Sequence, residues 1–418
     1  MSAPRAKRAW RNPALLALGV RGQTVRMRWT PLLLAVLSVG LMSYGPIEAP
    51  SVFKTRGHPV ATLVTPDGGH LLVTEDGANE DTSSPGVAGL EVFRFDGHSL
   101  HSERFIRLPG DPDGMTLIGG SRTLAFGLGD AMGFLDLDAA LAGTGKPIII
   151  PFARRAAPHY LTTSQDGRFL FATIEYGGDG EAAIFALGHG KAGLSTTIRA
   201  VISVPSSAPD LVLSPDGSRL YVVSEIAPTE EPLAGSGQPM LDRNDCRQGQ
   251  SGPQRNGVLY TFDVQALMRL SARPSRRLRD FARALLSRSA AGCSPVRLVI
   301  SADGQRVFVS ARGENRVLVF DARKLETDPD HALLHALSSG GESPVGLQLS
   351  ADGRRLVVAD SNRFNTAPGA IAVLDAETGQ LLALFKAGTF PRNVETTPDG
   401  TTFVTDFVSN AIEVLAAR

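Results

Sequence analysis

The side chains of this sequence that could do chemistry are acids and histidines that recur at two places around Asp-Gly dipeptides. In most copies an acid stands eight or nine residues after the dipeptide, as Glu175 and Glu225 do. A second set, which includes two histidines, stands shortly before it. Carboxylate oxygens can hold a hard cation such as Ca²⁺, and a carboxylate or an imidazole can act as a general base in hydrolysis.

These residues form two groups. The group before the dipeptide comprises His58, Asp113, His159, Asp210, Glu342 and Arg392. The group after it comprises Glu75, Asp76, Asp130, Glu175, Glu225, Arg312, Asp360 and Asp406. For any single acid there is a simpler explanation, because Asp at the start of a loop often forms an Asx-turn or caps a strand end. A functional site requires a fold that brings the two groups together.

The elements that could position these residues form an internal repeat. The phrase Pro-x₇-Asp-Gly occurs at 59–68, 158–167, 295–304, 344–353 and 391–400, in a shorter form at 209–217, and in a degenerate form from Pro112. The copies are 46 to 53 residues apart, except for one interval of 87 residues that contains an insertion. The regular interval is close to the length of a four-stranded propeller blade.

Each copy predicts four short antiparallel strands. In 344–388 two alternating apolar runs flank an Asp-Gly turn, and two further apolar runs follow. Glycine supplies the positive φ that a tight hairpin turn needs. Seven such units predict an all-β fold, a seven-bladed β-propeller of four-stranded antiparallel blades, because each blade then covers its neighbour and no long edge stays open.

The two ends of the sequence predict how the ring closes. The last copy stops at Arg418 after three strands, whereas VFKTRGHP (52–59) is a fourth-strand phrase without the first three. This phrase is similar to LFKAGTFP (384–391), which ends the preceding copy. We therefore expect the strand around Val52–Thr55 to pair with the strand around Ala411–Leu415 and to complete the seventh blade.

The repeats at Ser214–Glu225, Ser301–Asp321 and Ser350–Asn362 resemble those of the YVTN-type β-propellers. That superfamily includes lactonase-like propellers similar to 6-phosphogluconolactonase. The phrase APHYLTTSQDGRFLFATIEYG (157–177) is similar to a Pro-His…Asp-Gly-Arg-Phe-Leu phrase of those enzymes, which implies His159 and Glu175 as candidate catalytic residues. The same repeat serves enzymes, carriers and scaffolds, so the resemblance implies the fold more strongly than the function.

In such a ring the first strand of each blade lines an axial channel, and both groups of polar residues fall around its mouth. Convergent polar groups in a concavity are the usual sign of a binding site. No particular metal is predicted, and Ca²⁺ is the candidate that a ring of carboxylates suggests. The candidate ligand-binding residues at the mouth are His58, Asp76, Asp210, Glu225, Arg312, Asp360, Arg392 and Asp406.

Residues 1–45 form a basic leader ahead of the propeller at 46–418. Seven of the 42 bases and none of the 42 acids lie in the leader, which leaves 35 bases against 42 acids in the remainder. The apolar run at 30–45 predicts a secretory signal or an uncleaved signal anchor, with Met27 as an alternative start. We therefore expect a periplasmic or extracellular protein, with a membrane tether if the leader stays, and no nucleic-acid binding by its acidic body.

The two cysteines, Cys246 and Cys293, predict one disulfide in an exported protein. They lie in or beside two insertions in the fourth blade, at 226–256 and 265–292. The second insertion is predicted to form a basic amphipathic helix around Leu278, Phe281 and Leu285. The disulfide would fix the longer loop near the channel mouth, either as a lid or docking arm or as a decoration of an outer blade.

Two functions of different classes follow. The first is an exported propeller that binds a small molecule or a protein partner at its channel mouth without catalysis. The alternative is a lactonase-like hydrolase that uses the mouth carboxylates and His159, with or without a divalent metal. The repeats do not supply a complete catalytic set, so the sequence favours the first function.

Overall fold

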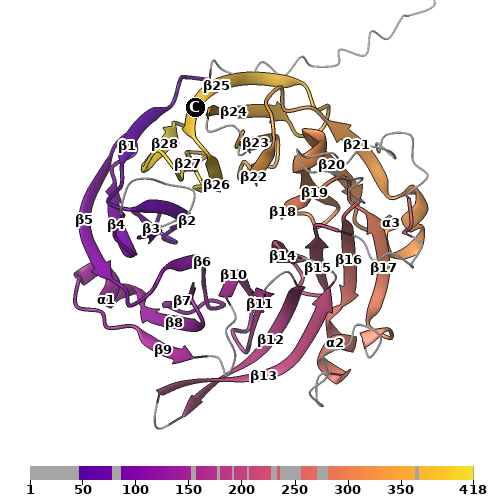
Figure 1. The fold of residues 1–418 in the computed structure, drawn as a ribbon, viewed down its shortest axis with the longest axis horizontal. Helices are drawn as coiled ribbons and strands as arrows, with labels where there is room; N and C mark the ends of the chain where they lie inside the picture. The colour runs from indigo at the N-terminus through magenta and orange to yellow at the C-terminus, as the bar shows by residue number, and fades with distance from the viewer. Residues whose placement is uncertain are drawn as a thin grey trace, which may run out of the picture. The chain divides into compact units, whose positions relative to one another are not determined.

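The computed structural model describes residues 47–77, 86–151, 157–176, 179–190, 193–204, 207–226, 233–235, 256–270, 281–362 and 367–417. Within them, 28 strands form seven four-stranded antiparallel sheets, arranged as blades around a central axis (Figure 1). The prediction of an all-β, seven-bladed propeller is confirmed. No helix in these described ranges has the length and apolar character needed to cross a bilayer.

The blades follow one another along the chain. Blade 1 comprises β2 (His58–Val64), β3 (His70–Asp76), β4 (Gly89–Phe95) and β5 (Leu100–Arg107). Blade 2 comprises β6 (Pro112–Leu117), β7 (Thr123–Leu128), β8 (Ala131–Asp136) and β9 (Ile148–Pro151). Blade 3 comprises β10 (Ala157–Thr163), β11 (Phe169–Tyr176), β12 (Asp179–Gly190) and β13 (Gly193–Val204). Blade 4 comprises β14 (Asp210–Leu213), β15 (Arg219–Ser224), β16 (Val258–Asp263) and β17 (Leu285–Ala290).

The remaining three blades repeat the same order. Blade 5 comprises β18 (Pro295–Ile300), β19 (Arg306–Ala311), β20 (Arg316–Asp321) and β21 (Leu333–Leu337). Blade 6 comprises β22 (Pro344–Leu349), β23 (Arg355–Asp360), β24 (Pro368–Asp375) and β25 (Leu381–Thr389). Blade 7 comprises β26 (Pro391–Thr396), β27 (Thr402–Asp406), β28 (Ala411–Leu415) and β1 (Ser51–Lys54).

Blade 7 is built from both ends of the propeller. Strand β1 pairs antiparallel with β28, in a register that sets Ser51 opposite Val414 and Lys54 opposite Ala411. The sheet order is β1-β28-β27-β26, so the N-terminal strand is the outermost strand of the last blade. The predicted closure of the ring is confirmed.

Each inner hairpin is fixed by a local Ser/Thr-x-Asp-Gly turn. In blade 6 the Ser350 hydroxyl and the backbone N–H of Arg354 both donate to Asp352 Oδ1, at 2.6 and 3.0 Å. Gly353 has φ +68°, a left-handed conformation that favours glycine. The same turn recurs in blades 1, 3, 4, 5 and 7, which explains the repeated Asp-Gly dipeptide.

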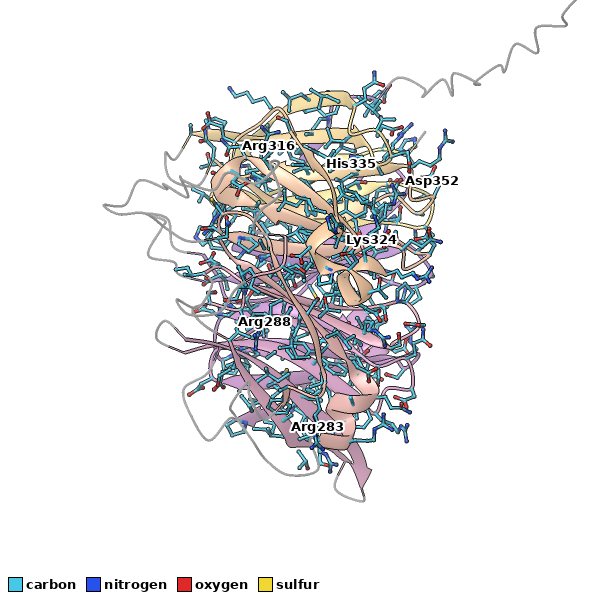
Figure 2. All side chains as sticks on the ribbon, turned by 90° about the vertical axis from the view of Figure 1, so that its right-hand side faces the viewer. Arg283, Arg288, Arg316, Lys324, His335 and Asp352 are labelled. Atoms are coloured by element: carbon cyan, nitrogen blue, oxygen red, sulfur yellow. The ribbon has the colours of Figure 1, made fainter. Side chains whose placement is uncertain are left out.

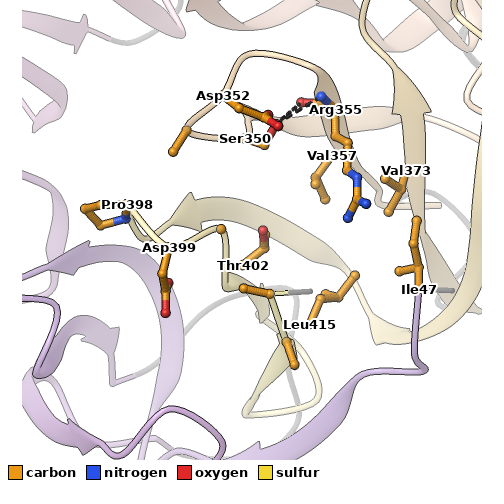
Figure 3. A pocket seen from close by; sticks show the side chains of 14 residues that line it. Ile47, Ser350, Asp352, Arg355, Val357, Val373, Pro398, Asp399, Thr402 and Leu415 are labelled. Atoms are coloured by element: carbon orange, nitrogen blue, oxygen red, sulfur yellow. Dashed lines mark hydrogen bonds between the residues drawn. The ribbon is translucent and has the colours of Figure 1, made fainter. Parts of the chain in front are cut away.

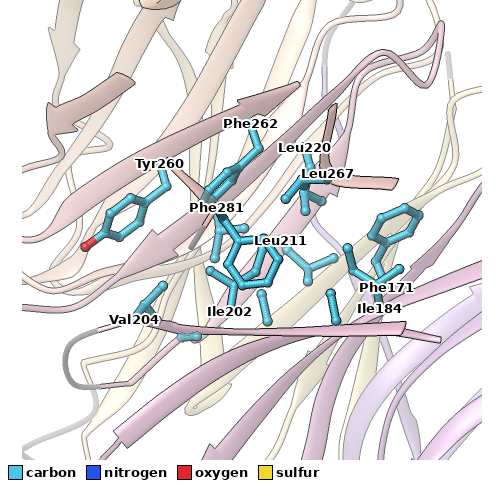
Figure 4. Packing of buried hydrophobic residues seen from close by; sticks show 14 of the residues in the cluster. Phe171, Ile184, Ile202, Val204, Leu211, Leu220, Tyr260, Phe262, Leu267 and Phe281 are labelled. Carbon is cyan, nitrogen blue, oxygen red and sulfur yellow. The ribbon is translucent and has the colours of Figure 1, made fainter. Parts of the chain in front are cut away.

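The core lies between neighbouring blades. Phe171 and Ile184 of blade 3 pack with Leu211 and Phe262 of blade 4 in one cluster of buried side chains (Figure 4). Burying one such side chain stabilises the fold by about 1.5–3 kcal/mol. Because every blade needs the face of the next one, the ring positions all seven inner strands together.

Short helices lie outside the sheets. They are α1 (Leu137–Ala142), α2 (Val264–Leu270), α3 (Lys324–Thr327) and the 3₁₀ turns η2 (Arg312–Glu314) and η3 (Pro329–His331). The outer side of blades 4 and 5 carries Arg288 on β17, Lys324 on α3 and His335 on β21 (Figure 2).

The helix predicted around Leu278, Phe281 and Leu285 is wrong in its described part. Residues 282–284 form a turn, and Leu285 begins β17, which pairs with β16 as the fourth strand of blade 4. Phe281 is buried in the core between blades 3 and 4, so tertiary packing overrides the helical spacing. Leu278 lies outside the described residues. The insertion predicted at 265–292 therefore contains an integral strand of the blade.

Candidate functional site

The side chains at the channel mouth are positioned by the way each inner strand begins. A proline of the repeat stands at or beside the first residue of every inner strand, where an unpaired edge tolerates the missing N–H. In six blades the pairing of the first two strands shifts directly after this proline, as between Pro158 and Leu161. Such β-bulges re-aim side chains and are frequent beside functional sites.

Five side chains from four blades meet at this end of the channel, and we call them the mouth network: Asp113, His159, Tyr160, Arg297 and Arg392. His159 Nδ1 is hydrogen-bonded to Asp113 Oδ2, and Arg392 Nη2 lies 3.6 Å from Asp113 Oδ1. Arg297 Nη2 donates to the Tyr160 hydroxyl, and its guanidinium carbon lies 3.8 Å from the centre of the Tyr160 ring. Tyr160 is also an electrostatic neighbour of Arg392. The network therefore joins blades 2, 3, 5 and 7.

The network is shielded but reachable from the mouth. The side chains of His159, Asp113 and Arg392 are 25%, 18% and 19% exposed, and Arg297 is buried. Burial pushes the pKa of Asp113 up, but His159 and then Arg392 and Arg297 outweigh it, so the pKa is lowered. Asp113 is therefore an ionised partner for the imidazole.

The two arginines differ in their partners. Burial pulls the pKa of Arg392 down, but attraction to Tyr160 and Asp113, and more weakly to Asp76, outweighs it and raises the pKa. Arg297 has no carboxylate within ion-pair distance among the described residues, and its Nε lacks a hydrogen-bond partner there. A buried guanidinium without a carboxylate partner is costly, unless a ligand supplies the missing anion.

Asp210 interacts electrostatically with Arg297, but both of its carboxylate oxygens already accept backbone hydrogen bonds. Its Oδ1 and Oδ2 accept the backbone N–H groups of Leu211 and Leu298, each at 2.8 Å. Burial raises the pKa of Asp210 to about 6, against the opposing attraction of Arg297. Asp210 therefore links blade 4 to the inner strand of blade 5. Its protonation state sets whether a negative charge stands near Arg297.

Three predicted site residues have partners outside the mouth network. His58 is fully buried, its Nδ1 is hydrogen-bonded to Phe407 O at 3.1 Å, and the two rings lie 5.2 Å apart. Glu225 and Arg312 form an ion pair of 2.9 Å between blades 4 and 5. These contacts support the packing of the mouth end.

Two predicted acids are buried in their own blades. Asp360 accepts a hydrogen bond of 2.7 Å from the Ser339 hydroxyl, and burial raises its pKa to about 7. Asp406 is buried beside Glu413 in blade 7. The expected ring of solvent-facing carboxylates is therefore broken, because the acids at the ends of the second strands point into blade interiors.

The remaining predictions are only partly covered by the described residues. The backbone of Glu175 pairs with Ala157, but its side chain lies outside the described set. Cys293 is buried, and Cys246 lies outside the described residues, so their disulfide stays a prediction. In the described part of the chain, no three His, Cys, Asp or Glu side chains form a group that could hold a metal. The expectation of Ca²⁺ therefore has no described site.

A hollow of about 180 Å³ lies away from the mouth network, at the Asp-Gly turns of blades 6 and 7 (Figure 3). Apolar Ile47, Val357 and Leu415 line it together with Asp352 and Arg355. It is at the opposite end of the blades from the mouth, because the turns and the inner-strand starts are at opposite ends of each inner strand.

Tyr160 and Arg297 were missed by the sequence predictions. Each stands two residues after the proline of its repeat, Pro158 or Pro295. The signal that could have found them is this shared position, which aligns one residue beyond the polar group selected from the sequence.

Comparison with known proteins agrees with this architecture. Residues 283–397 match the family model described as Lactonase, 7-bladed beta-propeller. The matched segment contains Arg297 and Arg392 but neither Asp113 nor His159. No curated protein matches this chain.

A solved structure with a similar fold is the Cps50 (Swd1) β-propeller domain of Myceliophteria thermophila. It has 11% sequence identity and a TM-score of 0.57, and the match covers 89% of this chain and 100% of that chain. At this identity the likeness shows the fold alone. Together with the seven blades, these findings identify the protein as a seven-bladed β-propeller, one segment of which is similar to the lactonase propeller family.

Proposed function

We propose that the mouth network binds a small anionic molecule, such as a carboxylate or phosphate compound, without transforming it. The observation that carries this proposal is buried Arg297, which has no carboxylate partner among the described residues and an unused Nε donor. Arg392 approaches from blade 7, and its Nη2 lies 3.6 Å from Asp113 Oδ1. Two guanidinium groups around Tyr160 suit an anion, because charge-assisted hydrogen bonds to oxyanions are the strong ones.

The proposal is tested by direct binding. Purified protein is titrated calorimetrically with a panel of small carboxylates and phosphates, and the same titration is repeated with Arg297→Gln. Arg316→Gln is the matched control, since Arg316 lies on β20 and is exposed. We expect saturable binding that is weakened at least tenfold by Arg297→Gln and unchanged by Arg316→Gln. Equal binding by both variants would contradict a ligand at the mouth network.

A second candidate function is lactone hydrolysis, which the His159–Asp113 pair favours. Ionised Asp113 holds the imidazole and stabilises its protonated form, as in a general base oriented by a carboxylate. His159 would take a proton from the water that attacks the lactone carbonyl carbon. The ring C–O bond then breaks, and the proton passes to the leaving alkoxide to give a hydroxy acid. Arg297 and Arg392 would stabilise the oxyanion.

Turnover separates the two functions. A lactone panel is assayed by acid release, with and without Ca²⁺ and with a chelator. Hydrolysis that is lost in His159→Gln and strongly reduced in Asp113→Asn supports the enzyme, whereas binding without turnover supports the first proposal. Dependence on Ca²⁺ would point to a metal held by residues outside the described set.

We also propose that the protein is exported, on the basis of the apolar run at 30–45 and its basic flank. Export into an oxidising compartment would allow the Cys246–Cys293 disulfide. Mass determination of the mature N-terminus and of free thiols in protein from a cell fractionation tests both points. An unprocessed cytoplasmic chain with two free thiols would contradict them.

A further inference from the structure

Two buried pairs of carboxyl groups occupy equivalent positions in neighbouring blades. Glu75 and Glu91 lie on the second and third strands of blade 1, and Asp406 and Glu413 lie on those of blade 7. Their residues are 0%, 1%, 1% and 2% exposed. The strand register sets Glu75 opposite Gly89 and Glu91 opposite Val73, so the two acids are diagonal neighbours on paired strands, and Asp406 and Glu413 are related in the same way. Glu75 Oε1, Asp406 Oδ1 and Glu413 Oε2 are buried without a hydrogen-bond partner among the described residues. Two neighbouring buried acids cannot both be ionised without strong repulsion, so each pair retains one proton.

Each pair holds the segment of chain that leads into an inner strand, and Gly388 is still part of β25. The backbone N–H of Gly57 donates to Glu75 Oε2. The N–H of Gly388 donates to Glu413 Oε1 at 2.8 Å and to Asp406 Oδ2 at 3.1 Å. These glycines belong to the two similar phrases VFKTRGHP and LFKAGTFP, so the sequence echo corresponds to a repeated contact.

A basic side chain lies near each pair and can balance the charge of one ionised carboxylate. The second carboxyl group then requires a proton to be neutral. Arg56 Nε lies 3.3 Å from Glu91 Oε1, which also accepts a hydrogen bond from the Ser102 hydroxyl. Lys54 attracts the ionised form of Asp406, while its Nζ donates to Ser409 O at 3.0 Å. A pair that holds one proton carries one negative charge, which its single cation balances.

We propose that each pair shares one proton and acts as a pH-sensitive latch that holds the segments at 54–58 and 386–391 in place. These segments lead to His58 and to Arg392 of the mouth network. The latch is a property of the free protein and does not depend on what the mouth binds. Loss of the proton would put two like charges into each buried site and weaken the hold on Gly57 or Gly388.

The direction of the pH dependence follows from the protonated members. Burial, and then the neighbouring carboxyl, raise the pKa of Glu75 to about 10 and that of Asp406 to about 9. The same groups ionise near their ordinary, lower pKa in the unfolded chain. The stability that protonation confers is therefore fully present below that ordinary pKa and is lost as pH rises through the folded-state pKa.

A bound cation fits these sites less well than a proton. Each pair offers only two carboxyl groups, whereas Ca²⁺ prefers six to eight oxygen ligands. Each also accepts a backbone N–H, which would face an incoming cation.

Unfolding at several pH values tests the latch in the full chain. Glu75→Gln and Asp406→Asn mimic the protonated members, because an amide can donate to the partner carboxylate and still accept the glycine N–H. Denaturant unfolding is measured between pH 6 and 9 for the wild type, each variant, the double variant and the control Glu377→Gln, whose side chain is 80% exposed. We expect the folding equilibrium constant of the wild type to decrease as pH rises. Each protonated group contributes up to a tenfold decrease per pH unit, and each mimic should abolish the contribution of its own pair.

Amide hydrogen exchange at Gly57 and Gly388 provides a local readout. After correction for the intrinsic rate, wild-type protection at these amides should fall toward pH 10 and persist in the double variant. If one mimic does not fold, Glu91→Gln and Glu413→Gln place the neutral amide on the other member and carry the same expectation.

Two results would overturn the latch. One is a set of pH–stability curves that run parallel in the wild type, the double variant and Glu377→Gln. The other is saturable stabilisation of the wild type by Ca²⁺ that the double variant lacks, which would make the pairs a cation site.

Discussion

At the scale of residues, the binding properties of the mouth depend on which charged side chains have a partner of opposite charge. Asp113 has His159 and Arg392 as partners, whereas Arg297 has a hydroxyl, two backbone carbonyls and an aromatic ring around it. A guanidinium in this environment contributes little to the stability of the fold, since replacing a buried charge by an apolar group is often neutral or stabilising. Its contribution is therefore expected in ligand binding.

Arg297→Met is therefore expected to separate binding from stability. The unfolding free energy should stay within about 1 kcal/mol of the wild type or rise, because the costly desolvation of the guanidinium is removed. Affinity for the anionic ligand should fall at least tenfold, as expected for the loss of a hydrogen bond to a charged group. Denaturant unfolding and calorimetric titration of the same preparation check both parts, and a large loss of stability would contradict a binding role.

The pH dependence of binding should report on Asp210. Its pKa, raised by burial to about 6, means that the carboxyl becomes neutral as pH falls from 7 to 5. Arg297 then loses a negative neighbour, so an anion should bind more tightly at pH 5 than at pH 7. An aryl sulfonate probe, whose own charge is constant in this range, isolates the effect. Asp210→Asn should bind with little pH dependence, and an unchanged dependence in this variant would exclude Asp210 as its source.

At the scale of elements, the inner hairpins depend on their Ser/Thr-x-Asp-Gly turns. In blade 4 the Ser214 hydroxyl donates to Asp216 Oδ1 at 2.5 Å, and the backbone N–H of Ser218 donates to the same oxygen at 2.9 Å. These bonds favour the ionised acid, and the hydrogen bond from Ser214 is the largest reason that the pKa of Asp216 is lowered to about 2. Six such turns give the propeller a common acid-sensitive element.

Acid unfolding should reveal these turns. A lowered folded-state pKa contributes stability that is present above the ordinary pKa of Asp and is lost as pH falls through the folded value, here from about pH 4 to pH 2. Asp216→Asn should therefore lose less stability than the wild type over this interval, measured by thermal unfolding at fixed ionic strength. The wild type and Asp138→Asn, a surface control on α1, should lose similar amounts.

At the scale of the whole molecule, the ring is closed by four residues. Strand β1 covers β28, and Phe53 packs against the cluster that includes Phe95 and Phe403 between blades 7 and 1. Without β1, the edge of β28 would stay unpaired in an otherwise closed ring.

A truncation that removes β1 tests the closure. A chain that starts at residue 56 should be less stable than one that starts at residue 46 by about 3–5 kcal/mol, since it loses Phe53 packing and several strand hydrogen bonds. Denaturant unfolding of the two chains gives the difference. Equal stability would show that the seventh blade does not need its fourth strand.

The sequence by itself determined the number of blades, the closure and the end of the channel at which polar residues gather. Proline at an inner-strand start and Asp-Gly at the hairpin act through local backbone preferences, so they can be read from the repeat. The two similar phrases likewise predicted the exchange of one strand between the ends of the chain.

Only the tertiary structure decided which polar residues form a site. Asp113 of blade 2 lies 3.6 Å from Arg392 of blade 7, whereas His58, Asp360 and Asp406 are buried and hydrogen-bonded elsewhere. The repeat assigns each of them an equivalent backbone position, but a strand-end side chain can point to the axis or into a blade. That choice depends on bulges, neighbouring blades and the ring as a whole, none of which a single repeat contains.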